Sequence, residues 1–224
     1  FASSRGADGA SADTVVASPP VINPLLERAG AVARGPRPSE AVAIYREALA
    51  ADPSLAEARL ALAALLARLE RFDEALAVLD GGLEQSPAQM ELLVLRGGIF
   101  GSLRRYDEAE ADLRRVLRLN PAHAAAHLEL GRVLARKGMS AQATAHFRSS
   151  TESQPDRADA HAALGGMLNQ SGDLAGARAA LERAVELDSR DAKAWHLLGR
   201  VYDRLARPEE ARDCYQRSRE LLGG

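Results

Sequence analysis

The sequence predicts an all-α protein in which helical hairpins of equal length stack side by side. Proline recurs every 34 residues, at Pro53, Pro87, Pro121 and Pro155. Between successive prolines, two stretches carry apolar residues three and four positions apart, and a short polar or glycine-containing break separates them. That pattern is typical of a helical hairpin. Because self-similarity at one fixed interval indicates stacked repeats, we expect an α-solenoid.

The composition agrees with this prediction and excludes several classes of protein. Of the 224 residues, 46% are hydrophobic but only 4% are aromatic, so the helices must pack mainly through alanine, leucine and valine. The formal net charge of −2 provides no general attraction to nucleic acid or to an anionic membrane surface. No apolar run approaches the roughly 20 residues that cross a bilayer. Because Cys214 is the only cysteine, no internal disulfide can form.

The proline interval sets the register of six predicted hairpins. Each proline closes the second helix of its unit, because its ring cannot continue an interior helical turn and disfavours a helical predecessor. Ser189 stands at the proline place in the fifth unit, and Gly223 stands there in the sixth. Asn23 and Pro24 are suited to start the first helix, as N-cap and first-turn residue. The predicted units begin at Ile22, Ala56, Met90, Ala124, Ala158 and Ala192.

Small residues mark where the paired helices are expected to cross. Counted from the first residue of each unit, places 8 and 20 hold only alanine or glycine, and two helices approach closely only where side chains are small. Place 24 holds a bulkier residue, which we expect to fill the space beside the crossing. Place 8 is Ala29, Ala63, Gly97, Gly131, Gly165 and Gly199; place 20 is Ala41, Ala75, Ala109, Ala143, Ala177 and Ala211; place 24 is Tyr45, Leu79, Leu113, Phe147, Leu181 and Tyr215.

The sixth unit carries the clearest family signature. It reads Trp195, Leu198, Gly199, Tyr202, Ala211 and Tyr215, which follows nearly the whole pattern W-x2-L-G-x2-Y…A-x3-F. The third to fifth units carry most of the same pattern. The chain therefore resembles a tetratricopeptide repeat (TPR) protein of the bacterial type over residues 22–224. This resemblance implies a right-handed α-solenoid of about six hairpins that holds protein partners on its concave side.

Residues 1–21 differ from the predicted TPR domain at residues 22–224. They are rich in alanine, serine and glycine, show no helical periodicity, and end in a double proline. Such a composition buries too little apolar surface to order itself. We expect an extended low-complexity segment that is held by this protein's own groove or by a neighbouring chain.

The C-terminal end of the repeats leaves two interpretations open. Place 28 is leucine or valine in most units but is Arg219 in the sixth, which favours a last helix that faces water. The alternative is that Leu221 and Leu222 are left for a partner or for a second copy of the chain.

The sequence lacks the motifs of catalytic and metal sites. It contains no nucleotide loop, no HExxH and no CxxC. His123 and His127 are spaced i, i+4, but zinc needs further ligands, and His146 on the other predicted helix has no carboxylate beside it. Cys214 lies within a helix, with no helix N-terminus beside it to activate the thiol. We predict that the protein is not an enzyme and has no catalytic residue, metal site or cofactor.

The resemblance implies a binding groove lined by the first helix of each hairpin. Places 2, 5, 9, 12 and 13 would point into it, which makes the groove apolar towards its N-terminal half and basic towards the other. A peptide or helix with apolar anchors and acidic residues would complement this gradient. The alternative is that the arginines only solvate the surface. The predicted groove residues are Leu60, Ala64, Val94, Gly98, Leu128, Arg132, Arg136, Lys193, His196, Arg200 and Arg204.

The leading hypothesis is a non-catalytic protein-interaction scaffold. We expect an accessory or assembly subunit that docks onto a larger complex, including a membrane-associated one, through its groove or its ends. The alternative is a regulatory or targeting module of a longer enzyme, or of a secretion or assembly factor. Binding to nucleic acid is disfavoured, because no aromatic residues interleave with the groove arginines to stack bases.

The compartment and the source are only indirectly indicated. Heavy use of alanine, arginine and glycine is typical of a GC-rich bacterium. The start at Phe1 favours an exported, periplasmic or membrane-peripheral protein slightly over a cytoplasmic one.

Overall fold

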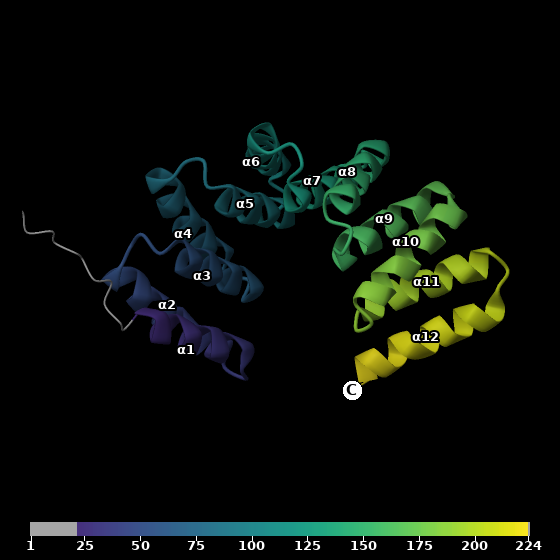
Figure 1. Ribbon diagram of the computed structural model, residues 1–224, viewed down its shortest axis with the longest axis horizontal. Coiled ribbons are helices and arrows are strands. Elements are labelled where there is room, and N and C mark those ends of the chain that lie inside the picture. The colour runs from purple at the N-terminus through teal and green to yellow at the C-terminus, as the bar shows by residue number, and fades with distance from the viewer. Residues whose placement is uncertain (1–21, 224) are drawn as a thin grey trace, which may run out of the picture. The chain divides into compact units, whose positions relative to one another are not determined.

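The computed structural model describes residues 22–223, which form α-helices and no strand (Figure 1). The all-α repeat fold predicted from the sequence is confirmed. The predicted extended segment, residues 1–21, lies outside the described residues. The helices are α1 (Ile22–Arg34), α2 (Pro38–Ala51), α3 (Ala56–Arg68), α4 (Phe72–Gln85), α5 (Met90–Ser102), α6 (Tyr106–Leu119), α7 (Ala124–Arg136), α8 (Ser140–Ser153), α9 (Ala158–Ser171), α10 (Leu174–Leu187), α11 (Ala192–Arg204) and α12 (Pro208–Gly223).

The described residues form two compact units that divide within α3. The first contains α1, α2 and the part of α3 up to Ala61, and α1 packs on α2 there. The second begins at Leu62 and contains the rest of α3 with α4 to α12. In this second unit α5–α6, α7–α8, α9–α10 and α11–α12 pack as hairpins. Each second helix from α4 to α10 also contacts the first helix of the following hairpin, which stacks the repeats.

The helices of a hairpin cross where the sequence predicts it. A Cβ atom added at Gly131 on α7 would lie 2.6 Å from Cε1 of Phe147 on α8. In the next hairpin, a Cβ atom at Gly165 would lie 2.5 Å from Cγ of Leu181. These separations are shorter than van der Waals contact, so in these two hairpins only glycine at place 8 allows the bulky residue at place 24 to pack so closely.

From the second hairpin to the sixth, the turn reverses the chain through a left-handed residue at place 15. Gly138 and Gly172 adopt φ values of 79° and 90° there, which glycine tolerates without strain. Glu70, Arg104 and Ala206 occupy the same place with φ values of 58°, 60° and 56°. An L-residue in this region brings its Cβ atom close to the following carbonyl oxygen, so these three turns are strained.

Replacing Ala206 with glycine is expected to stabilise the protein by about 0.5–1 kcal/mol. Relief of the left-handed strain, roughly 1–2 kcal/mol, exceeds the additional entropy that glycine gains in the unfolded chain. The reciprocal variant, Gly138→Ala, should lose about 1 kcal/mol. Urea denaturation followed by circular dichroism measures both changes, and a loss of stability in Ala206→Gly would show that the strain argument is wrong.

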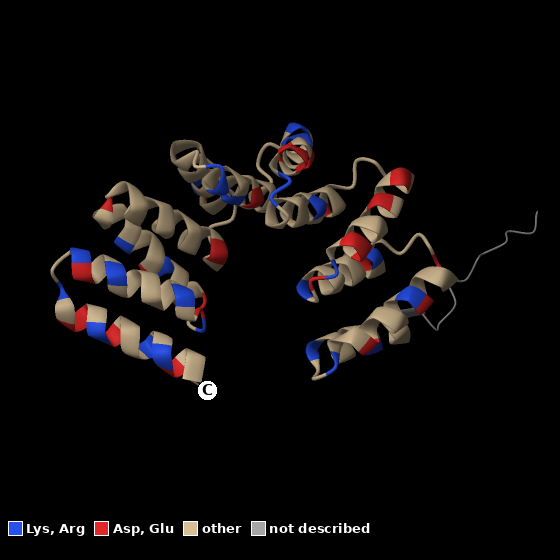
Figure 2. Cartoon of the chain, turned by 180° about the vertical axis from the view of Figure 1, so that it is seen from behind, with Lys and Arg blue, Asp and Glu red and all other residues tan. Residues whose placement is uncertain are grey.

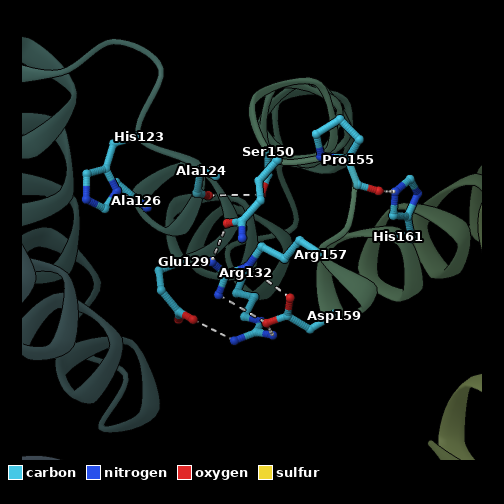
Figure 3. Close-up of polar contacts among 11 residues, drawn as sticks. His123, Ala124, Ala126, Glu129, Arg132, Ser150, Pro155, Arg157, Asp159 and His161 are labelled. Carbon is cyan, nitrogen blue, oxygen red and sulfur yellow. Dashed lines mark hydrogen bonds and ion pairs between the residues drawn. The ribbon is translucent and has the colours of Figure 1, made fainter. Parts of the chain in front are cut away.

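The junctions between hairpins are fixed by side chains at place 4. In three units a ring nitrogen at this place bonds the carbonyl oxygen six residues earlier, at the end of the preceding hairpin. Figure 3 shows one of these contacts, between His161 and Pro155. The bonds join His127 to Pro121 (2.9 Å), His161 to Pro155 (3.0 Å) and Trp195 to Ser189 (3.1 Å). The two histidines are therefore satisfied packing residues.

Candidate functional site

The second unit carries a depression of about 640 Å³ that we call the arginine groove. Its walls come from α7 and α11, and its floor comes from α9, which lies between them in the stack (Figure 1). Each wall contributes two arginines spaced i, i+4, so that both members project from the same face of their helix. The wall residues are Arg132 and Arg136 on α7 and Arg200 and Arg204 on α11, and the small floor residues are Ala162, Ala163 and Gly166.

Arg132 already has carboxylate partners (Figure 3). Its guanidinium group lies 2.5 Å from an oxygen of Glu129 on the same helix and 3.5 Å from Asp159 on α9. Arg157 contacts the same Asp159 carboxylate at 2.9 Å. Because two acids offset its charge, Arg132 has less to gain from an acidic ligand than the other groove arginines.

Arg136 and Arg204 are held by neutral acceptors. Arg136 donates from Nη1 to the carbonyl oxygen of Gly101, at 2.7 Å, in the last turn of α5. Arg204 makes the corresponding contact two repeats further along the chain. It donates from Nη1 to the carbonyl oxygen and to the side-chain oxygen of Asn169 on α9. A cation is favoured near the C-terminus of a helix, which explains the position of both side chains. No carboxylate neutralises either charge within residues 22–223.

Arg200 is the least constrained arginine of the groove. Its side chain is exposed, and the described part of the chain gives it neither an ion pair nor a hydrogen bond. Basic residues stand along α11 in Figure 2, where they are coloured blue. A guanidinium group has five N–H donors in a planar arrangement that matches a carboxylate. Arg136, Arg200 and Arg204 therefore give the groove three positive charges that are available to an anionic ligand.

The remaining predicted groove residues do not join these four arginines. The prediction that Leu128 lines the groove is wrong, because this side chain is fully buried and cannot contact a partner. Gly98 lies on α5 beside α7, where an added Cβ atom would be 3.3 Å from Oε2 of Glu129. Val94 is half-buried on the same helix. His196 lines a different depression, on α11 and α12, and its ring lies 5.3 Å from that of Tyr215.

Three further predicted residues lie outside the groove lining. Leu60 is half-buried on α3 within the first unit, and Ala64 is exposed on the same helix. Lys193 is exposed in the first turn of α11, one residue after the helix begins. All residues that line the arginine groove come from α7, α8, α9 and α11.

Several residues that shape the groove were not predicted from the sequence. Asn169 is 95% buried and accepts a hydrogen bond from Arg204. It was not among the predicted residues, although the resemblance implies that place 12 points into the groove. Leu197 and Met167 add apolar surface, and Phe147 reaches the lining from α8. The repeat register could have revealed the contact between Asn169 and Arg204, because Arg204 follows Asn169 by one repeat and one residue.

The groups that could suggest chemistry are accounted for by packing. His123 is the N-cap of α7 and accepts a hydrogen bond from the backbone N–H of Ala126 at 3.2 Å. Burial, with added repulsion from Asp213, raises the pKa of the Cys214 thiol to about 11. In residues 22–223, no three His, Cys, Asp or Glu side chains are grouped so that they could hold a metal ion.

His127 and His146 form a direct contact between α7 and α8. Their Nδ1 atoms are 2.9 Å apart, and Nε2 of His127 bonds the Pro121 carbonyl oxygen. Since a carbonyl oxygen only accepts, Nε2 of His127 donates to it, and only one of the two facing Nδ1 atoms can carry a proton while they are hydrogen-bonded. Burial, followed by the charges of His127 and Arg114, lowers the pKa of His146. The contact therefore cannot accommodate protonation of both imidazole rings.

Acid should weaken this hairpin. Because the folded-state pKa of His146 lies below its unfolded value of about 6.5, the stability it confers is complete above that pH and is lost as the pH falls through the folded-state pKa. We expect the urea concentration at the midpoint of unfolding to decrease when the pH is lowered from 7.5 to 5. The variant His146→Gln should lose most of this pH dependence, whereas His161→Gln should keep it. Equal pH dependence in wild type and His146→Gln would contradict this role.

None of the helices in the described part of the chain is both long enough and apolar enough to cross a membrane.

Two models of known protein families match the repeats of this chain. A family model described as the middle TPR-like domain of cilia and flagella-associated protein 70 matches residues 102–222, more than half of the chain. A tetratricopeptide repeat model matches residues 32–93. No curated protein matches the chain.

Solved structures share the fold at low sequence identity. PilF of Pseudomonas aeruginosa is 20% identical, with a TM-score of 0.72 over 91% of this chain and 92% of that one. PilW, described as a type IV pilus biogenesis factor, is 24% identical, with a TM-score of 0.72 over 87% and 90%. YrrB, described as a TPR protein with an unusual peptide-binding site, is 21% identical, with a TM-score of 0.55 over 79% and 91%. With its family matches and its stacked hairpins, the chain belongs to the tetratricopeptide repeat family.

Proposed function

We propose that this protein is a non-catalytic scaffold that binds an acidic polypeptide segment of a partner in the arginine groove. The observation that carries the proposal is the set of three arginines without a carboxylate, Arg136, Arg200 and Arg204, around one depression. In this role the protein is an accessory or assembly subunit of a larger complex. The peptide-binding site of YrrB and the biogenesis role of PilW belong to those proteins, and the proposal rests on this chain's own arginines.

The electrostatics favour an anionic ligand such as a carboxylate. A carboxylate can accept two parallel N–H bonds from one guanidinium group, and such charged hydrogen bonds are shorter and stronger than neutral ones. Arg136 and Arg204 keep free N–H groups after bonding Gly101 and Asn169, and they need not break those bonds to receive a ligand. Arg200 can turn towards the ligand because no other group holds it. Glutamate or aspartate side chains spaced along one segment can reach all three.

The floor of the groove favours small apolar anchors. Ala162, Ala163 and Gly166 leave it shallow, and Leu197 and Met167 give it apolar surface. A Cβ atom added at Gly166 would have Leu197 Cδ1 as its nearest neighbour at 3.9 Å, so this position is open. A helix or an extended segment could bury apolar side chains here while its acids face the arginines.

The test uses the full chain and a labelled synthetic peptide with alternating leucine and glutamate anchors. Fluorescence anisotropy should detect binding that weakens with added salt, because the contacts are ionic. Arg200→Glu should weaken binding by about tenfold or more, since a charged hydrogen bond contributes roughly 1.5–3 kcal/mol and the variant adds repulsion. Because Arg200 is exposed and unbonded, this variant should fold normally.

The matched control is Arg148→Glu, which makes the same charge change on the exposed surface of α8. It should alter the affinity by less than about twofold, since long-range charge effects are screened at physiological salt. A second peptide, with glutamine in place of glutamate, should bind weakly to every variant. Equal binding of the two peptides, or equal losses in Arg200→Glu and Arg148→Glu, would refute the proposed groove.

A further inference from the structure

The outer face of the last hairpin contains a second depression, of about 550 Å³, between α11 and α12. Tyr215 and Ala211 form its apolar base, and Leu222 stands at its C-terminal end with 76% of its surface exposed. We call this surface the end face. No helix among residues 22–223 covers it.

In the preceding hairpin, the equivalent face is covered by the first helix of the next repeat, α11. Thirty-four residues before Asp203, Tyr215 and Arg219 stand Asn169, Leu181 and Val185. These three counterparts are 5%, 0% and 7% exposed, because α11 packs against both α9 and α10. In the last hairpin Asp203 and Arg219 are exposed and Tyr215 is half-buried. The end face therefore continues the inter-repeat interface, whose occupant in the stack is an amphipathic helix.

The charges at the rim define which helix fits. Arg212 and Arg219 are exposed on α12 and form no ion pair or hydrogen bond within the described residues. Charges of both signs alternate along this helix in Figure 2. The acidic residue that lines the end face, Asp203, already has a hydrogen-bond partner. Asp203 accepts a hydrogen bond of 2.6 Å from the Tyr215 hydroxyl group. The rim is thus basic on the side where Arg212 and Arg219 stand.

We propose that the end face binds an amphipathic α-helix of a partner protein. The helix packs as the first helix of a further hairpin would, with its apolar side on Tyr215 and Leu222. Its flank carries glutamate or aspartate residues that pair with Arg212 and Arg219. This surface uses none of the groove arginines, so the inference goes beyond the proposed function and does not depend on it.

The experiment locates a probe helix on the full chain. The probe is a synthetic helical peptide with a leucine stripe flanked by glutamates, in which one leucine is a photoreactive analogue. Illumination followed by mass spectrometry should place cross-links on α12 around Tyr215 and Leu222. The double variant Arg212→Glu/Arg219→Glu should reduce these cross-links at least tenfold, and so should Leu222→Ser, whose exposed side chain contributes little to folding. Arg148→Glu, on the exposed surface of α8, should leave them unchanged.

Three results would overturn the inference. The first is cross-linking that both end-face variants leave unchanged. The second is cross-linking confined to the arginine groove and abolished by Arg200→Glu, which supports the proposed function while removing this second surface. The third is a concentration-dependent dimer in analytical ultracentrifugation that Leu222→Ser abolishes, which would assign the end face to a second copy. If the end-face cross-links form and no peptide binds the groove, the inference stands and the proposed function fails.

Discussion

Replacing Gly131 with valine is expected to lower the free energy of unfolding by about 2–3 kcal/mol. A Cβ atom at this position would lie 2.6 Å from Cε1 of Phe147, and Phe147 is only 2% exposed at this helix crossing. Forcing extra atoms into a well-packed contact shifts side chains and backbone, which typically costs 1–3 kcal/mol. Urea denaturation monitored by circular dichroism should show a lower midpoint.

Two further variants separate overpacking from a general effect of losing glycine. Gly166→Ala changes a helical glycine whose nearest neighbour is 3.9 Å away, so it should stabilise the protein by about 0.5–1 kcal/mol. The double variant Gly131→Ala/Phe147→Leu installs the residues that the second repeat has at these places, Ala63 and Leu79. It should unfold within about 1 kcal/mol of the wild type. Destabilisation by Gly166→Ala equal to that of Gly131→Val would show that the crossing contact is not the cause.

Replacing Arg96 with methionine is expected to cost about 3 kcal/mol of stability. Arg96 on α5 donates to both oxygens of Asp112 on α6, at 2.7 and 2.8 Å, and to Asp80 on α4 at 2.6 Å. These hydrogen bonds, above all that to Asp112, raise the pKa of Arg96. Asp112 is only 7% exposed, so the variant would leave a buried carboxylate without its partner, which is strongly destabilising.

The double variant Arg96→Met/Asp112→Leu tests this explanation. It removes both charges and leaves apolar side chains of similar size, an exchange that is often neutral for a buried ion pair. Stability should return to within about 1 kcal/mol of the wild type. If the double variant lost as much as the sum of both single variants, the unpaired carboxylate would not be the source of the cost, and the measured coupling would be near zero.

The helices and their crossings were predictable because one interval governs them. The helices α1, α3, α5, α7, α9 and α11 begin at the six residues from which that interval was counted. The glycine at place 8 meets the bulky residue at place 24, as Gly131 meets Phe147. Both features depend on side-chain size and helix termination, which are local properties of the sequence.

The groove was only partly predictable, because the repeat register gives the direction of a side chain but not its neighbours. Leu128 was expected to line the groove, yet it is fully buried, although Ala162 at the same place of the next unit does line the groove floor. The bond of Arg136 to the Gly101 carbonyl oxygen depends on how successive hairpins rotate. The pairing of Arg132 with Asp159 depends on the same rotation, and no single-chain pattern reveals which arginines remain without an acid.

A charge exchange between the groove and its ligand tests the central claim most directly. The affinity of Arg200→Glu is measured for the acidic peptide and for a peptide in which one glutamate is replaced by lysine. If Arg200 receives a carboxylate, the variant should bind the lysine peptide at least tenfold more tightly than the acidic one, and the wild type should show the opposite preference. The same preference in both proteins would contradict the claim that the arginine groove binds acidic polypeptide.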